Sequence, residues 1–203
     1  MAVQSGVYRG VSAAERAAER RSRLLDAALA VWADPGTRTT MTAVCAEAGL
    51  TERYFYESFR HLDDVLLAVL EQVADEIEET TTAAREAAGD DPGARVRATM
   101  TTFVDLLVED PRKARVAIIE AGAMPSLRAR RTELLRHFAH ACAEEAGGLE
   151  GLPHRGAAAD EVAGLMFVGG LAELVTAWLD SAVATSPEEL VEAATRSFLA
   201  LYG

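Results

Sequence analysis

The sequence predicts an all-α protein of about nine helices, with three shorter N-terminal helices followed by a larger helical region. Ala, Leu, Glu and Arg recur at helical spacing, whereas β-branched residues are scattered. Half of the 203 residues are apolar, which is enough for a sizeable core. The longest uncharged apolar run, 162–172, is shorter than the roughly 20 residues that cross a bilayer. We therefore expect a soluble, cytoplasmic protein that has no membrane partner.

The first expected helix begins at a capping box formed by Ser12 and Glu15 and runs to about Ala33, where Asp34-Pro35-Gly36 ends it. Its apolar stripe is Leu24, Ala28, Val31 and Trp32. The remaining helices are expected at about 40–48, 51–59, 62–88, 94–109, 111–123, 125–146, 157–183 and 187–202. Pro111, Pro125 and Pro187 are each expected in a first helical turn, and 147–156 is expected to be a loop.

The formal charge of -12 lies entirely after residue 63. Residues 1–63 hold eight arginines and eight acids, whereas the rest of the chain holds twelve basic residues and twenty-four acids. A net charge of this sign argues against nonspecific binding of polyanions. The neutral, arginine-rich N-terminal part can nevertheless contact one. Two cysteines, Cys45 and Cys142, are too few for a disulfide framework.

Residues 40–59, TMTAVCAEAGLTERYFYESF, fit a helix-turn-helix. Gly49 supplies the positive φ of a tight turn, small residues at 45, 46 and 48 permit a close crossing, and Thr51 can cap the second helix. The residues expected to face a shared core are Val44, Leu50, Phe55 and Phe59, with Leu24, Leu25 and Ala28 from the first helix. Arg53, Tyr54, Tyr56 and Glu57 are left with nothing to pack on, as in a helix that reads a DNA groove. The alternative is an ordinary helical hairpin with a surface arginine.

The run AEAGLTERYFYESFRHLDDVLLAVL, preceded by RRSRLLDAALAVW, resembles the TetR family of transcriptional regulators. The specific likeness covers about residues 20–70. The remainder agrees in the number of helices and in the GGLAELVTAWL segment. The resemblance implies an N-terminal arm at 1–16 and a DNA-binding domain at 17–77. It also implies a ligand-binding and dimerisation domain at 78–203.

The resemblance further implies that Thr42 reaches DNA, that Glu52, Arg53 and Tyr54 face bases, and that Tyr56 binds a phosphate. This chain departs from the family in having Leu62 where a lysine is usual, and Arg53 where a small residue is usual. An arginine there predicts a guanine contact worth about 1–3 kcal/mol. The full predicted DNA-binding set is Thr40, Thr42, Thr51, Glu52, Arg53, Tyr54, Tyr56 and His61. Thr40 and His61 are included as replacement phosphate contacts, and the arm residues 8–10 either enter the minor groove or are disordered.

Two further sets are predicted for the C-terminal region. The resemblance implies a ligand cavity between the helices of this region, and the residues expected to line it are Met100, Phe103, Leu107, Glu120, Met124, His137, Met166 and Glu173. The alternative is that the apolar members of this set only pack in the core. A dimer interface is expected from Phe167, Gly170, Leu171, Leu174, Trp178 and Phe198, because the last two helices are apolar nearly all round. Replacing Leu171 and Leu174 with glutamate is accordingly predicted to give monomers.

These observations predict a homodimeric regulator that binds a near-palindromic DNA operator and is released by an apolar or amphipathic small molecule. No cofactor, resident metal or catalytic residue is predicted. The rival hypotheses are an enzyme or a protein-only adaptor. The enzyme would use a small molecule or a metal near His137 and His140, with Glu133 and Glu144 beside them.

Overall fold

The computed structural model describes residues 12–153 and 155–203. Within these ranges the chain forms nine continuous helical stretches and no strand, which confirms the predicted all-α fold. The chain divides between Glu71 and Gln72 into two compact units, which we call the N-terminal and C-terminal units.

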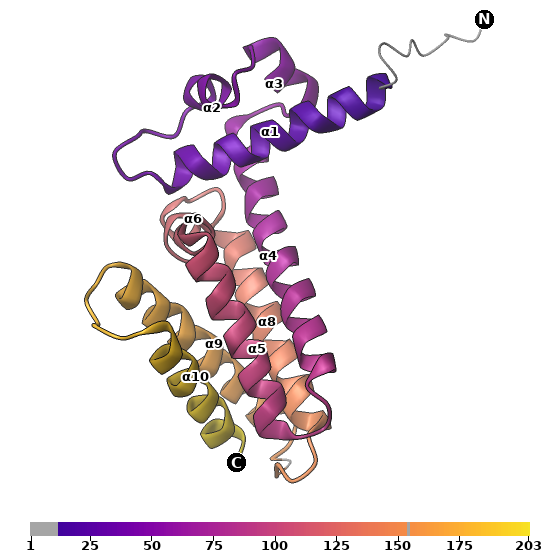
Figure 1. Ribbon diagram of the computed structural model, residues 1–203, viewed down its shortest axis with the longest axis vertical. Coiled ribbons are helices and arrows are strands. Elements are labelled where there is room, and N and C mark those ends of the chain that lie inside the picture. The colour runs from indigo at the N-terminus through magenta and orange to yellow at the C-terminus, as the bar shows by residue number, and fades with distance from the viewer. Residues whose placement is uncertain (1–11, 154) are drawn as a thin grey trace, which may run out of the picture. The chain divides into compact units, whose positions relative to one another are not determined.

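The N-terminal unit consists of α1 (Ala13–Ala33), α2 (Met41–Ala48), α3 (Glu52–Ser58) and the first turns of α4 (Leu62–Ala87). The predicted capping box starts α1, since the Glu15 amide donates to the Ser12 hydroxyl at 3.1 Å and the Glu15 carboxylate accepts from the Ser12 amide. Helices α1, α2 and α3 pack on one another. The fully buried side chains of this unit are Leu24, Ala28, Val44, Phe55, Val65 and Leu66. The arrangement of α1, α2 and α3 is seen in Figure 1.

The C-terminal unit holds the rest of α4, with α5 (Pro92–Glu109), α8 (Arg128–Gly148), α9 (Ala157–Leu179) and α10 (Pro187–Tyr202). One further continuous stretch joins α6 (Pro111–Ala114), a π-helix, η1 (Arg115–Glu120), and α7 (Ala121–Ala123). Helix α9 packs on α8, and α10 packs on α5 and α9 (Figure 1). The main core lies between α5, α9 and α10, where Phe167 and Phe198 meet edge to face at 5.2 Å.

Three helix ends differ from the sequence-based prediction. Helix α5 begins at Pro92, because the Asp91 carboxylate accepts a hydrogen bond from the Ala94 amide at 2.7 Å and caps the helix. Pro125 lies before α8 in a turn closed by bonds from the Leu127 and Arg128 amides to the Met124 carbonyl. Helix α9 ends at Leu179, four residues early, and Ser181 follows with a left-handed φ of 56°.

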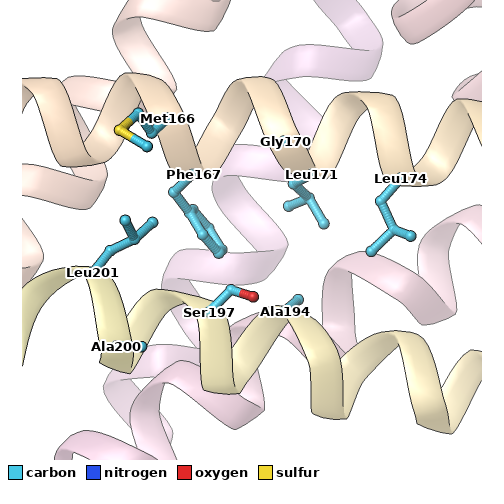
Figure 2. Close-up of a pocket in the computed structure, with 9 residues that line it drawn as sticks. All are labelled: Met166, Phe167, Gly170, Leu171, Leu174, Ala194, Ser197, Ala200 and Leu201. Atoms are coloured by element: carbon cyan, nitrogen blue, oxygen red, sulfur yellow. The ribbon is translucent and has the colours of Figure 1, made fainter.

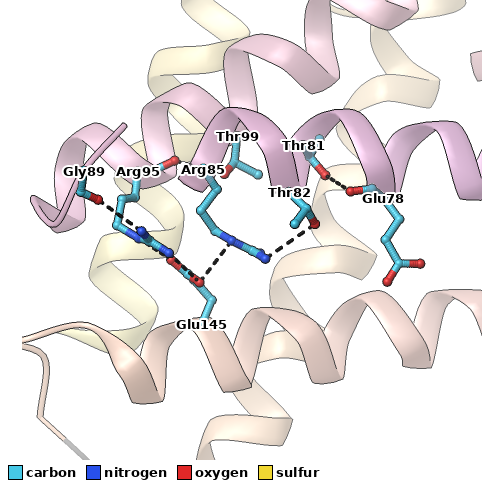
Figure 3. Close-up of polar contacts among 8 residues, drawn as sticks. All are labelled: Glu78, Thr81, Thr82, Arg85, Gly89, Arg95, Thr99 and Glu145. Carbon is cyan, nitrogen blue, oxygen red and sulfur yellow. Dashed lines mark hydrogen bonds and ion pairs between the residues drawn. The ribbon is translucent and has the colours of Figure 1, made fainter. Parts of the chain in front are cut away.

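A half-buried ion network ties three helices of the C-terminal unit together (Figure 3). The Glu145 carboxylate of α8 lies 2.7 Å from Arg95 Nε of α5 and 3.2 Å from Arg85 Nε of α4. Arg95 also donates to the Gly89 carbonyl at 3.0 Å, and the hydrogen bond to Glu145 raises the pKa of Arg95. Three helices thereby share one carboxylate, which fixes the C-terminal end of α4 within the unit.

Gly164 of α9 lies directly against the backbone of α8. A Cβ atom at this position would lie 2.2 Å from the Ala139 carbonyl oxygen and 3.1 Å from the Tyr202 hydroxyl. That hydroxyl donates to the Asp160 carbonyl at 3.1 Å, so the site is filled on both sides. Only a residue without a side chain fits there. At Gly169 and Gly170, further along the same helix, a Cβ atom would meet nothing within 4 Å.

Both cysteines are expected to resist alkylation while the protein is folded. Burial raises the pKa of Cys142 to about 12 and also raises that of Cys45. Since the thiolate is the reacting form, only roughly one Cys142 in ten thousand is reactive at pH 8. Iodoacetamide followed by intact-mass measurement is expected to leave both thiols unmodified, and to modify both once urea has unfolded the chain. Rapid modification of the folded chain at pH 8 would contradict this packing.

Candidate nucleic-acid interface

The turn between α2 and α3 forms as its sequence predicts. Gly49 has φ 61° and ψ 35°, its amide donates to the Ala46 carbonyl, and the Leu50 amide donates to the Cys45 carbonyl at 2.9 Å. Arg23 of α1 donates to the Ala48 carbonyl at 2.6 Å, which satisfies the C-terminal end of α2. The geometry of this turn fixes the direction in which α3 leaves it.

Helix α3 is held by its aromatic residues on one face. Phe55 is fully buried, and its ring lies 5.8 Å from that of Phe59, which caps the helix. The guanidinium of Arg21 lies 4.9 Å from the centre of the Phe59 ring. Because these rings fix the inner face, the orientation of the opposite face is fixed as well.

The opposite face of α3 carries the predicted base-reading residues. Arg53 has 85% of its side chain exposed, and Tyr56 is 58% exposed. Glu52 and Thr51 are exposed on the same helix start, and Thr42 is exposed on α2. Thr51 occupies the N-cap position of α3 without the predicted side-chain hydrogen bond. This face therefore offers an arginine fork, hydroxyl groups and a tyrosine ring to a groove.

Tyr54 and Glu57, which were expected to have nothing to pack on, both contact Arg20 of α1. The Arg20 guanidinium lies 4.7 Å over the Tyr54 ring, and its Nη2 donates to Glu57 Oε2 at 3.1 Å. Glu57 also pairs with Arg53. Tyr54 and Glu57 can reach α1 because Arg20 lies one turn before Leu24, on the side of α1 that faces α3. That spacing was the signal that could have identified Arg20.

The predicted phosphate contacts lie at helix starts. The Thr40 hydroxyl caps α2 by accepting a hydrogen bond from the Ala43 amide at 3.1 Å. His61 is exposed, and its backbone amide donates to Asp64 Oδ2 at 2.9 Å. Leu62 is half-buried, so the position at which the family usually has a lysine is apolar here. Residues 8–10, predicted as a minor-groove arm, lie outside the described residues.

The residues predicted to line a ligand pocket differ in how deeply they are buried in the C-terminal unit. Met100 and Leu107 are buried in two different core clusters, and Phe103 packs against both. Met124 is half-buried at the end of α7, whereas Met166 and Glu173 are exposed.

The remaining polar members of that set have surface partners. Glu120 accepts from Arg115 Nε at 3.1 Å, and His137 Nε2 lies 3.0 Å from Glu78 Oε1 at the surface. His140 faces Glu144 and Glu161 instead, so the two histidines have separate partners. Within the described ranges no three metal-ligating side chains come together.

A groove of about 460 Å³ lies between α9 and α10 (Figure 2). Phe167, Leu171 and Leu174 point from α9 toward α10, and Leu201 points back from α10. Small residues, Gly170, Ala194, Ser197 and Ala200, line the rest together with Met166. The groove is therefore apolar and shallow, and it adjoins the outer face of α9.

Several residues of the predicted dimer interface pack within the subunit. Phe167 and Phe198 are buried in the core of the subunit, and Leu171, Leu174 and Trp178 pack against that core. In the middle of α9 the exposed residues are Val162, Leu165, Met166, Gly169 and Gly170, which we call the α9 stripe, and the exposed Glu173 follows them. Their spacing of three and four residues places them on one side of the helix. Only Gly170 belongs both to the α9 stripe and to the predicted dimer interface.

Helix α9 is long and apolar enough, by length and composition, to cross a membrane. Over its most apolar 18 residues the mean hydropathy is 1.8, and only 22% of that window is buried. The uncharged run 162–172 is only part of this helix, so the length of that run understates how apolar α9 is as a whole. The other side of α9 supplies Phe167 and Val175 to the core of the C-terminal unit.

Residues 24–69 match the family model described as bacterial regulatory proteins, tetR family. This segment spans most of the N-terminal unit, from the middle of α1 to the first turns of α4. No curated protein sequence matches the chain significantly.

Solved structures resemble the chain over nearly its whole length. The fatty acid degradation regulator FadR from Bacillus halodurans has a TM-score of 0.72 and 19% identity, covering 89% of this chain and 94% of its own. A transcriptional regulator from Rhodococcus sp. Rha1 has a TM-score of 0.72 and 20% identity, covering 88% and 93%. The FadR of Bacillus subtilis in complex with stearoyl-CoA has a TM-score of 0.67 and 20% identity, covering 90% and 97%. At these identities the likeness is one of fold.

Proposed function

We propose that this chain, a member of the tetR family of bacterial regulatory proteins by its DNA-binding segment and its fold, is a cytoplasmic homodimeric repressor released from DNA by a small molecule. The observation that supports this function best is the face of α3. A buried phenylalanine fixes the helix, and the side chains of Arg53, Tyr54 and Tyr56 are exposed on it. Such a face suits the major groove, which admits an α-helix and displays a distinct pattern of donors and acceptors for each base pair.

In this proposal some of the exposed side chains contact base edges, and the others contact phosphates. Glu52, Arg53 and Tyr54 face base edges, and Arg53 pairs with O6 and N7 of a guanine. Tyr56, Thr42, Thr51, Thr40 and His61 meet phosphate oxygens, which fix register without carrying sequence information. Since the chain has a net charge of -12, specific contacts have to outweigh a general repulsion from DNA.

The dimer presents two copies of α3 to one face of the duplex. Successive major grooves on that face are about 34–36 Å apart, so a two-fold symmetric protein requires a near-palindromic operator. The α9 stripe and the neighbouring groove supply the apolar surface for the second copy. An exposed apolar stripe of this length is otherwise unfavourable in water.

The effector is proposed to be apolar or amphipathic. The support is the likeness in fold to the FadR of Bacillus subtilis, which was solved in complex with stearoyl-CoA. A ligand of this kind would release DNA only to the extent that it prefers the conformer with weaker DNA affinity. Stearoyl-CoA and coenzyme A alone are therefore the first pair of probes to add to a protein–DNA complex, because they differ only in the acyl chain.

Selection from a pool of random 40-base-pair duplexes tests the DNA-binding function directly. The full-length protein is expected to enrich a near-palindromic site. Binding to that site in a mobility-shift assay should weaken steeply with salt, because phosphate contacts release counterions. Failure to enrich any duplex at low salt would remove the proposed function.

Substitutions at Arg53 and Tyr56 are expected to separate reading from anchoring. Arg53→Ala should weaken binding to the selected site by about 1–3 kcal/mol and flatten the preference at one base pair per half-site. Tyr56→Phe removes only a hydroxyl, so it should weaken all duplexes by a similar factor and leave the preference profile intact. Repeating the selection with both variants measures the two profiles. An unchanged profile for Arg53→Ala would assign the reading to Glu52 or Tyr54, or would show that this face does not enter a groove.

A further inference from the structure

Glu57 lies between two arginines, and each of its carboxylate oxygens faces one of them. Oε2 accepts from Arg20 Nη2 of α1 at 3.1 Å, and Oε1 lies 3.5 Å from Nε of Arg53, four residues earlier on α3. Arg20 is itself held, because 24% of its side chain is exposed and its guanidinium lies over the Tyr54 ring. Glu57 is therefore anchored by α1 on one side, while its other oxygen faces the most exposed of these side chains.

The atom that faces Glu57 determines what Arg53 can offer to DNA. Since the carboxylate faces Nε, the two terminal nitrogens of Arg53 remain at the outer end of the side chain. A guanine is recognised by two parallel N–H groups directed at O6 and N7, and those terminal nitrogens form such a pair. An arginine that is 85% exposed has many rotamers available, and an ion pair with Glu57 favours those that keep Nε beside the carboxylate.

A carboxylate on this face also has a cost. Glu57 repels DNA phosphates, so its presence lowers the affinity for every duplex. Removing it should therefore strengthen binding to DNA in general while weakening discrimination at one base pair. A residue that merely supports the fold would weaken both together.

We propose that Glu57, tethered by Arg20, is a positioning residue that holds the Arg53 fork in the orientation required to read guanine. The inference rests on the proposed DNA-binding function and names a determinant of its specificity. It assigns no direct base contact to Glu57.

The experiment compares Kd values of the full-length protein for the selected duplex, for its single-base variants and for a random duplex, by fluorescence anisotropy. Glu57→Gln is expected to lower the discrimination at the base pair read by Arg53 about three- to tenfold, since a charge-assisted contact is lost. Its affinity for the random duplex should stay equal or rise. Glu57→Asp keeps the charge but shortens the side chain, so it should lose discrimination without that rise. In an Arg53→Ala background, neither substitution should change discrimination further.

The chain offers a closely matched control in its C-terminal unit. Glu192 pairs with Arg196 four residues later and with Arg97 from another helix, so Glu192→Gln removes the same charge from the same kind of pair. It is expected to leave the base preference unchanged. Circular dichroism of each variant verifies that the helices are intact.

Three results would overturn the inference, and they differ from one another. Discrimination that is lost in Arg53→Ala but kept in Glu57→Gln would show that Arg53 needs no positioning. Loss at a different base pair, persisting in the Arg53→Ala background, would show that Glu57 reads a base itself. If the unsubstituted protein selects no duplex, the proposed function fails and the inference fails with it.

Discussion

Replacing Val162 and Met166 together with glutamate is expected to convert the proposed dimer into monomers and to weaken binding to the selected duplex about 100-fold or more. The size of the loss follows from avidity, because two linked recognition helices bind one operator far more tightly than either helix alone. Sedimentation velocity measures the assembly, and a mobility-shift assay on the selected duplex measures the binding. Far-UV circular dichroism should show that helical content is retained.

The choice of these two residues follows from their exposure. Val162 is 56% and Met166 62% exposed, so glutamate at either position is solvated in the monomer and adds little strain to its fold. In a dimer that uses the α9 stripe, two copies of each new carboxylate would lie in an apolar interface, where burial of an unpaired charge is strongly unfavourable. The substitution is thus directed at assembly and spares the fold of the subunit.

Val108→Glu on α5 is the matched control, because Val108 is also an exposed apolar residue of the C-terminal unit. It should remain dimeric and bind the operator normally. If Val162→Glu/Met166→Glu still sediments as a dimer, the α9 stripe is not the interface. The effector would then become the next candidate for the exposed apolar surface.

The pair suggested by the sequence, Leu171 and Leu174, would give a less clear result. Both leucines pack against the main core, and Leu171 also packs against the cluster around Val175. Glutamate at either position would place a charge against the subunit's own core and unfold part of it. Loss of binding would then have two explanations.

The sequence was most informative where local chemistry determines the structure. The turn at Gly49 requires a left-handed residue, the cap at Thr40 requires a side-chain acceptor, and the start of α1 requires a capping box. Each of these is encoded by a few adjacent residues, so the helix-turn-helix could be predicted within one or two residues. The exposure of Arg53 and Tyr56 followed from the burial of Phe55 between them.

It was least informative where the outcome depends on which side of a helix meets a neighbour. Helix α9 is apolar nearly all round, so its sequence pattern does not distinguish the side facing α8 and α10 from the side facing solvent. The π-helix at Arg115–Glu120 and the sharing of Glu145 by Arg85 and Arg95 likewise depend on tertiary contacts.

Replacing Gly164 with alanine is expected to lower the free energy of unfolding of the C-terminal unit. Gly164→Ala would place a Cβ atom 2.2 Å from the Ala139 carbonyl oxygen, so α9 and α8 would have to move apart. Overpacking of this kind costs about 1–3 kcal/mol, and we expect the upper end because the obstructing atom belongs to the backbone. To avoid a contribution from dimerisation, Gly164→Ala is introduced into the Val162→Glu/Met166→Glu protein. Urea unfolding followed by circular dichroism then measures the change in the free energy of unfolding.

Gly169→Ala on the same helix is the control with the opposite sign. Its Cβ atom would meet nothing within 4 Å, so the higher helix propensity of alanine should stabilise the monomeric protein by about 0.5–1 kcal/mol. In the dimeric protein the same substitution should instead weaken association, since Gly169 belongs to the α9 stripe that would lie against the partner. Equal free energies of unfolding for Gly164→Ala and the parent would mean that α8 and α9 separate without cost. The close contact at Ala139 would then contribute nothing to stability.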